Sequence, residues 1–178
     1  NIISTREEVE VKENGEYTYN YNHSDSYIEG LGITLFKHYN NAELVRALVG
    51  LGNTSSIYNT IENTATSYRE HINRDREERG TVANFRDSQR WADLRDYDLT
   101  WDECKPIVTD NINEVLGEAF TYIYDVDASK WLIACDEDHY RVRDLETVLH
   151  SKELLESLFS ERYIKEYLPE FYEKCLSA

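Results

Sequence analysis

Methionine is absent from this 178-residue chain, proline occurs twice, and cysteine occurs three times, at Cys104, Cys135 and Cys175. The cysteines lie far apart, with neither a CxxC pair nor the spacing of a zinc site. An odd number cannot pair completely within one chain, so a fully disulfide-paired framework is excluded. We expect free, buried thiols in a reducing compartment, the cytoplasm (the host cytoplasm for a phage-encoded protein).

Long apolar runs and familiar catalytic motifs are also missing. No stretch approaches the roughly 18 apolar residues that span a bilayer, and the first residues lack the basic-then-apolar pattern of a signal peptide. The chain contains no P-loop, GxGxxG, GxSxG or HExxH motif and no EF-hand loop. We therefore expect a soluble protein without a cofactor, a bound metal or a membrane partner, and we favour a non-enzymatic role.

Acidic residues dominate what the chain does contain, because 35 Asp and Glu against 19 Lys and Arg give a net charge of −16. The charge is −5 over residues 1–66, +1 over 67–95 and −12 over 96–178. The last segment would be repelled by a nucleic-acid backbone and attracted to basic protein surfaces, including nucleic-acid-binding grooves. Solubility alone is the alternative explanation of this charge. Tyrosine, with 14 copies, adds amphipathic rings that suit binding surfaces.

Two β-hairpins are predicted at separate places in the chain. Asn14-Gly15 stands between alternating β-formers, which predicts strands at about 6–13 and 16–22. The odd positions of the second strand are tyrosines, an aromatic face that we expect to pack on helices. A second hairpin is predicted with strands at 119–126 and 130–135, and a short strand at 140–142 follows it.

Helical patterns fill most of the remaining chain. Because a lone hairpin is marginal, we expect the two hairpins to unite in one antiparallel sheet. The predicted fold is a single α+β domain over residues 1–178, with about five to six helices and a helical insertion at about 53–116 between the hairpins. Apolar spacing and capping residues predict helices after Gly32, at 42–50, from about 55 to 80, at 100–103, at 106–116, at 151–159, and at 160–175 with a kink or break at Pro169.

The chemically densest stretch is 22–32, where the first hairpin leads into a helix. His23, Asp25 and Tyr27 share a face if the strand continues, since side chains alternate along a strand. A carboxylate beside a histidine orients the imidazole and raises its pKa, which suits a general base or a metal ligand. Helix capping by Asp25 and a bond from His23 to the backbone explain the same residues without catalysis. The residues of a possible anion site at this junction are Arg6, Gly30 and Gly32.

Residues 1–40 resemble an uncharacterised family found in bacteria and phages. Its members carry a motif like Asn-His-Trp-Asp-Ser-Tyr-Pro-x-Gly-Leu-Gly. This chain reads Asn22-His23-Ser24-Asp25-Ser26-Tyr27-Ile28-Glu29-Gly30-Leu31-Gly32, with Ser4-Thr5-Arg6 upstream. Ser24 thus replaces the Trp, Ile28 replaces the Pro, and Glu7 stands where a Gly is expected after the Arg. The family has no established activity, so the resemblance implies a phage or mobile-element origin and no mechanism.

Carboxylates bracket the second predicted hairpin and continue into the C-terminal helices. Around the hairpin they could hold Mg²⁺ or Ca²⁺, although turn aspartates are far commoner. Our first hypothesis is an acidic inhibitor, encoded by a phage or mobile element, that blocks a basic nucleic-acid-handling or host-defence protein by charge mimicry. The alternative is a small enzyme or ligand-binding domain at residues 23–27. The residues expected to bind the basic partner are Asp125, Asp127, Asp136, Glu137, Asp138, Glu153, Glu156 and Glu161.

Seven arginines between residues 69 and 95 form the one basic part of the chain. With aromatic residues interleaved, they could contact phosphate or an acidic partner. Six acids lie among them, so a solvated helix face with local ion pairs explains the same pattern.

Overall fold

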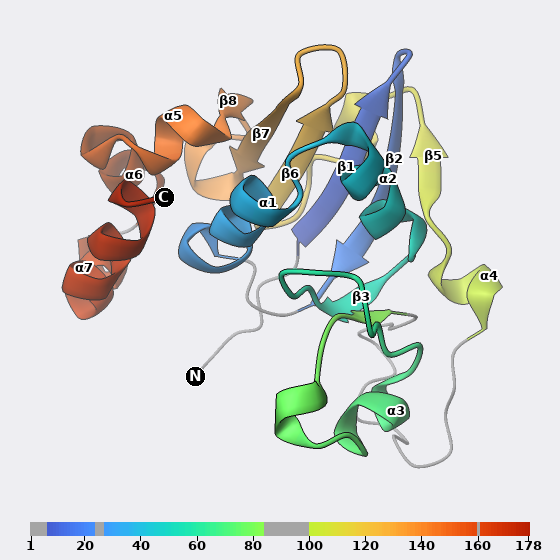
Figure 1. Ribbon diagram of the computed structural model, residues 1–178. Coiled ribbons are helices and arrows are strands. Elements are labelled where there is room, and N and C mark those ends of the chain that lie inside the picture. The colour runs from blue at the N-terminus through green and yellow to red at the C-terminus, as the bar shows by residue number, and fades with distance from the viewer. Residues whose placement is uncertain (1–6, 24–26, 84–99, 160) are drawn as a thin grey trace.

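The computed structural model describes residues 7–23, 27–83, 100–159 and 161–178 (Figure 1). A mixed eight-stranded sheet forms its centre, in the order β4-β3-β2-β1-β6-β7-β8, and β5 pairs with β2. Seven α-helices accompany the sheet in the described parts of the chain. The predicted α+β class is confirmed.

The first hairpin lies at the centre of the sheet. β1 (Glu7–Glu13) and β2 (Glu16–Asn22) pair in antiparallel register along their whole length. Asn14 and Gly15 between them have positive φ angles of 54° and 76°, as a type I′ turn requires. This predicted hairpin is confirmed, and so is the Asn-Gly turn from which it was predicted.

The second hairpin, β6 (Phe120–Asp125) with β7 (Lys130–Cys135), is also confirmed. β6 pairs with β1, so the two hairpins unite as expected, but β1 and β6 run parallel. β2 and β3 (Thr54–Ser56) are parallel as well. The expectation of a purely antiparallel sheet is therefore wrong. The direction in which two hairpins meet depends on the route of the chain between them, which no local pattern records.

The insertion at 53–116, expected to be helical, supplies three strands to the sheet. The long helix expected from about 55 to 80 is wrong, because β3 occupies its start and α3 (Tyr68–Ile72) is the α-helical part of this range. β3 pairs with β2 on one side and with β4 (Val82–Ala83) on the other. Strand pairing at this edge of the sheet thus overrides the helical spacing of the apolar residues.

The helix expected at 106–116 is also wrong. Pro106 lacks a backbone donor, and the β-branched run that follows it forms β5 (Ile107–Thr109), which pairs with β2. A 3₁₀ turn at Ile112–Glu114 is the helical remnant of this segment. Two further 3₁₀ turns lie at Arg76–Glu78 and Asp136–Asp138.

Several predicted helix boundaries are confirmed by their caps. Asn41 accepts a hydrogen bond from the backbone N–H of Leu44 (2.9 Å), and a capping box joins Thr100 with Glu103. α7 runs through Pro169 as one helix, so the expected division is absent from its described backbone. No helix among the described residues is long and apolar enough to cross a bilayer. The remaining elements are α1 (Ile33–His38), α2 (Ala42–Gly50), α4 (Trp101–Cys104), α5 (Leu145–Leu149), α6 (Lys152–Leu158), α7 (Glu161–Leu176) and β8 (Arg143–Asp144), the last lying just beyond the strand expected at 140–142.

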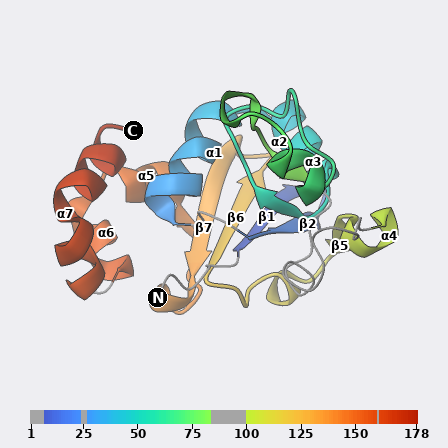
Figure 2. The ribbon, with the colours of Figure 1, turned by 90° about the horizontal axis from the view of Figure 1, so that it is seen from below.

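The two faces of the sheet are covered differently (Figure 2). α1 and α2 cover the face on which Val9 and Tyr122 belong to the main hydrophobic core. The segment between β5 and β6, yellow in Figure 2, covers the opposite face and packs Val115 against Tyr17 and Tyr19. The tyrosines of β2 therefore pack beneath this segment and not on helices as expected, because they point away from the valines of β1.

Candidate partner-binding surface

Acidic and tyrosine side chains gather on the sheet face that lacks α-helices. Glu8 lies opposite Tyr21 in the β1–β2 register, and Glu10 lies opposite Tyr19. Directly opposed residues of an antiparallel pair share a face, so these four side chains form two adjacent rows. Their surroundings supply further acids and one more tyrosine. We call the whole group the acidic tyrosine cluster, and its members are Glu8, Glu10, Tyr19, Tyr21, Glu114, Glu118, Asp136 and Tyr140.

Glu10 is the deepest member of the cluster, with an exposed fraction of 0%. Among the described residues no donor reaches either oxygen of its carboxyl group. Glu8 is 3% exposed and accepts a hydrogen bond from the Tyr21 hydroxyl, while its Oε2 atom has no donor. A buried carboxyl group without donors is unfavourable by several kcal/mol if it is charged, so both groups favour their neutral form.

The charged groups that act on the buried residues of the cluster are all acidic. Burial, and then the charge of Glu118, raise the pKa of Glu8 to about 8. Burial and the charge of Glu8 raise the pKa of Glu10 to about 9. The pKa of Tyr21 rises to about 12 for the same reasons, burial first and then Glu8. No basic side chain of the described residues offsets these shifts, so the cluster is an uncompensated acidic site.

The rim of the cluster reaches solvent. Glu114 and Asp136 are exposed, while Glu118, Tyr21 and Tyr140 are half-buried. The Tyr140 hydroxyl donates to Asp136, and burial followed by this carboxylate raises the pKa of Tyr140. A partner can thus touch carboxylates and tyrosine rings that adjoin the buried pair.

The structure divides the predicted hairpin acids between two ends of the hairpin. Asp125 and Asp127 lie at the β6–β7 turn, whereas Asp136 and its two successors follow β7 at the other end. Asp125 accepts from two backbone N–H groups of the turn and lies 3.9 Å from the Lys12 ammonium. A strand of six residues spans roughly 20 Å, so these acids cannot form one compact surface.

Asp138 is a structural residue. It is buried against Arg143, whose guanidinium donates to both carboxylate oxygens. This guanidinium lowers the pKa of Asp138 through its hydrogen bonds. Glu137 beside it is exposed and adjoins the cluster through its neighbour Asp136.

The helical acids lie on α6 and α7. Glu153 is exposed, and Glu156 accepts from the Tyr172 hydroxyl (2.8 Å) with Lys152 at 3.9 Å. Glu161 begins α7, and its side chain lies outside the described part of the structure. Of the eight predicted partner-binding residues, Asp136 is therefore the one that belongs to the acidic tyrosine cluster.

Sequence reasoning missed the buried glutamates of β1. Glu8 and Glu10 alternate with valines, which is typical of a strand with one wet face. β1 instead has a strand on each side and covered faces above and below. The available signal was the row of tyrosines on β2. A second layer of the protein has to cover so large an aromatic face, and Glu8 and Glu10 lie on that same face because they pair with Tyr21 and Tyr19.

The stretch 22–32 is described only in part. His23 is 6% exposed, and its backbone N–H donates to the Thr54 carbonyl (3.1 Å). Asp25 and Arg6 lie outside the described residues, so the expected His23/Asp25/Tyr27 group and the expected anion site with Arg6 stay predictions. Polar side chains at this end of the sheet bind one another: Thr54 Oγ1 donates to Asn22 Oδ1 (2.8 Å), and Asn22 donates to Glu7.

Gly30 and Gly32 lie in a π-helical turn, Ile28–Gly32, that leads into α1. A Cβ atom at Gly32 would lie 3.4 Å from the Tyr122 ring, which is ordinary van der Waals contact, so Gly32 is packed against Tyr122. Gly30 instead borders a pocket of about 360 Å³ between this turn and the end of α7. The pocket is lined by Tyr27, Glu29, Gly30, Leu31, Thr34, Ile57 and Lys174.

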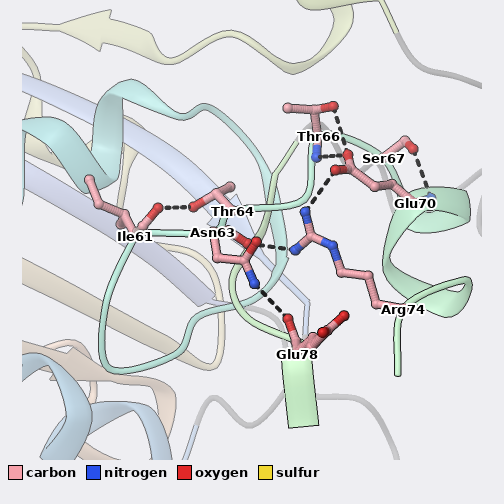
Figure 3. Close-up of polar contacts among 8 residues, drawn as sticks. All are labelled: Ile61, Asn63, Thr64, Thr66, Ser67, Glu70, Arg74 and Glu78. Carbon is pink, nitrogen blue, oxygen red and sulfur yellow. Dashed lines mark hydrogen bonds and ion pairs between the residues drawn. The ribbon is translucent and has the colours of Figure 1, made fainter. Parts of the chain in front are cut away.

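Two arginines of the basic segment, Arg74 and Arg79, bind groups of their own loop, and Figure 3 shows the contacts of Arg74. Arg74 donates to Glu70 (2.7 Å) and to the Asn63 carbonyl (2.5 Å), and Asn63 donates in turn to the Glu78 carbonyl. Arg79 donates to the carbonyls of Arg74 and Ile72. These contacts favour local ion pairing over phosphate binding for this part of the segment. The expected phosphate contacts at Arg86, Arg90 and Arg95 fall outside the described residues.

Metal ligation finds no support within the described parts. No group of three or more His, Cys, Asp or Glu side chains there is placed to hold a metal ion. Cys104, Cys135 and Cys175 are buried free thiols. Burial raises the pKa of Cys135 to about 11 and that of Cys175 to about 12, so neither is a reactive thiolate at neutral pH.

Comparison with protein-family models, with curated proteins and with solved structures returned no match to this chain.

Proposed function

We propose that this protein binds a basic protein partner through the acidic tyrosine cluster and thereby blocks the partner's own ligand site. The observation that supports this most is Glu10, a fully buried carboxyl group that faces Glu8 and has no hydrogen-bond donor among the described residues. Buried polar groups in folded proteins are normally satisfied, and an unsatisfied one calls for an explanation. A cationic partner that docks above the pair supplies the missing positive charge.

The rim has the chemistry of a protein interface. Tyrosine is enriched at binding hot spots because its ring is rigid and its hydroxyl remains polar. Glu114 and Glu118 add negative charges, which steer a basic partner and accelerate its association. Carboxylates and stacked rings are also the features by which a protein surface imitates phosphates and bases.

The partner we propose is a nucleic-acid-handling or host-defence protein whose groove is basic. The net charge of −16 makes such a groove the natural electrostatic complement. The resemblance of residues 1–40 implies an origin in a phage or mobile element, and we propose that the inhibitor is encoded there. A protein of this kind acts by occupancy and needs no catalytic group.

Removing rim charges should weaken binding to a polycation more than removing equal charge elsewhere. The test compares Glu114→Gln/Glu118→Gln with Glu166→Gln/Glu170→Gln on the exposed surface of α7, which has the same net charge. We expect the cluster variant to bind fluorescent poly-L-arginine about tenfold more weakly at 50 mM salt. The α7 variant should stay within about twofold of the wild type.

Salt provides the second readout of this experiment. The wild-type advantage over the cluster variant should shrink at 300 mM salt, because surface electrostatics are screened. Equal losses in the two variants would mean that overall charge, and not the cluster, attracts the polycation. That result would overturn the proposed surface.

A ligand-binding role for the stretch 22–32 is the second candidate function. One observation favours it: Tyr27 and Gly30 border the 360 Å³ pocket, a size typical of small-molecule sites. Thr34 and Lys174 add a hydroxyl and an exposed cation to its lining. The enzymatic form of this alternative would additionally require Asp25 beside His23.

Filling the pocket should displace any small molecule that purifies with the protein. Ile57 lines the pocket and is half-buried, so Ile57→Trp adds bulk there without opening the core. Native mass spectrometry should show extra mass on the wild type and on the control Lys37→Gln, and none on Ile57→Trp. Identical masses for all three proteins would argue against this role.

A further inference from the structure

We propose that docking of a basic partner on the acidic tyrosine cluster expels the proton of the buried Glu8, which lies beside Glu10, so that the partner binds more tightly as the pH rises. The inference rests on the proposed partner-binding function and concerns the regulation of the same site. It makes the cluster a proton-linked interface whose affinity depends on the acidity of its surroundings.

The cluster has a layered arrangement that connects its rim to its interior. Glu118, half-buried, acts electrostatically on Glu8, and Glu8 acts on Glu10. Glu8 and Glu10 are two positions apart on one strand, so their side chains point to the same face. A cation placed on the rim therefore favours ionisation of Glu8, whereas Glu10 keeps its proton because the charge of Glu8 raises the pKa of Glu10.

Every described element packed on the pair leaves it without a cation. β2 contributes Tyr19 and Tyr21, β6 contributes the uncharged Thr121 and Ile123, and the covering segment contributes two acids, Glu114 and Glu118. Lys12 lies on the same face of β1, but its ammonium is 3.9 Å from Asp125 and 6.0 Å from the Tyr17 ring centre. In the free protein the pair consequently holds its protons at neutral pH.

A bound cation reverses this preference. When a partner guanidinium or ammonium pairs with Glu118, the repulsion that opposes ionisation of Glu8 disappears and an attraction replaces it. At about 7 Å and an effective dielectric constant of about 20, such an attraction amounts to roughly 2 kcal/mol, enough to shift a protonation equilibrium at neutral pH. The O–H bond of the Glu8 carboxyl group then breaks, and the proton passes to water or buffer.

The sign of the pH dependence follows from linkage. The complex holds fewer protons than the free protein, so raising the pH favours the complex. The effect spans the range between the lowered pKa of Glu8 in the complex and its value of about 8 in the free protein. Affinity changes by at most about tenfold per pH unit for each proton released.

Calorimetry in two buffers counts these protons directly. Binding of poly-L-arginine is measured at pH 7.5 in phosphate and in Tris, whose ionisation heats differ, so the difference in observed heat gives the number of protons released. Arginine does not titrate here, so the probe contributes none. We expect about one proton per bound wild-type molecule, none for Glu8→Gln, and the wild-type number for Glu166→Gln/Glu170→Gln.

The variant Glu118→Gln changes a half-buried rim residue, so it tests the proton release without a substitution in the core that could disturb folding. It removes the rim charge that acts on Glu8, so fewer protons should be released than in the wild type. Binding with equal heats in both buffers would overturn the proton linkage and leave the proposed function standing. Proton release that is identical in the wild type and in both cluster variants would overturn it as well, and absence of binding would overturn both proposals.

Discussion

Replacing Gly52 with alanine should destabilise the protein by about 2 to 4 kcal/mol, as measured by urea unfolding at pH 7. Gly52 has a φ of +81°, which disfavours any side chain, and its added Cβ would lie 2.3 Å from the Cys104 carbonyl oxygen. That oxygen cannot move away, because it accepts a 2.7 Å hydrogen bond from the Asn53 N–H. The Gly52 carbonyl also accepts from the buried Asn20 side chain (2.6 Å). These two hydrogen bonds hold the backbone at Gly52 and at Cys104 in place, so neither segment can move away from the added Cβ.

Substitutions at two other glycines separate the cost of a positive φ angle from the cost of the close contact with Cys104. Gly15→Ala meets a similar φ of +76° with no atom within 4 Å, so it should cost only about 1 kcal/mol. Gly50→Ala lies in α2 with open space around it and should stabilise the protein by about 0.5 kcal/mol. If Gly52→Ala unfolds at the same urea concentration as Gly15→Ala, the close contact with Cys104 is not important.

Replacing Glu10 with glutamine should remove much of the fall in stability between pH 5 and pH 8. The folded-state pKa of Glu10, about 9, lies above the unfolded value of about 4.5. The folded protein thus binds one more proton than the unfolded chain between these values, and stability declines with rising pH until the folded pKa is passed. The loss is at most about 1.4 kcal/mol per pH unit, so Glu10→Gln should be roughly 2 to 4 kcal/mol less sensitive over this range.

The measurement is a series of urea unfolding curves from pH 5 to pH 9. Glu8→Gln should show a smaller flattening, and it should also lower the pKa of Glu10, since the charge of Glu8 is one cause of the elevation. Glu16→Gln on the exposed end of β2 is the control, and its curve should parallel the wild type. A wild-type stability that is constant between pH 5 and pH 8 would contradict a neutral carboxyl group at Glu10.

Local signals predicted the parts of the fold that neighbouring residues determine. Asn14-Gly15 specifies a turn with two positive φ angles, and the cap residues Asn41 and Ser151 begin their helices as expected. The parallel pairing of β1 with β6 has no such signal, because it joins residues that are distant in the chain. The apolar spacing between residues 55 and 72 fitted a helix, yet the partners offered by β2 and β4 decided the outcome at β3.

At the candidate site, too, the sequence predicted what depends on composition and missed what depends on contacts between distant residues. Net charge and tyrosine content indicated an acidic binding surface, but the sequence directed attention to the second hairpin and the C-terminal helices. The fold separates those acids and brings Asp136 together with glutamates from β1 and from the segment before β6. Asp138 could not be recognised as structural, because its partner Arg143 is reached only through the left-handed residues His139 and Tyr140.

The place of β1 between β2 and β6 has a consequence during synthesis on the ribosome. β2 follows β1 at once, but β6 begins more than a hundred residues after the end of β1, so one edge of the β1–β2 hairpin lacks its partner strand until β6 has been synthesised. An open edge is the template on which strands aggregate, and charges along it are the usual protection. Glu8 and Glu10 place two carboxyl groups on the strand that has this open edge. The glutamates that are buried in the finished protein are thus of the kind that protects an unpaired strand.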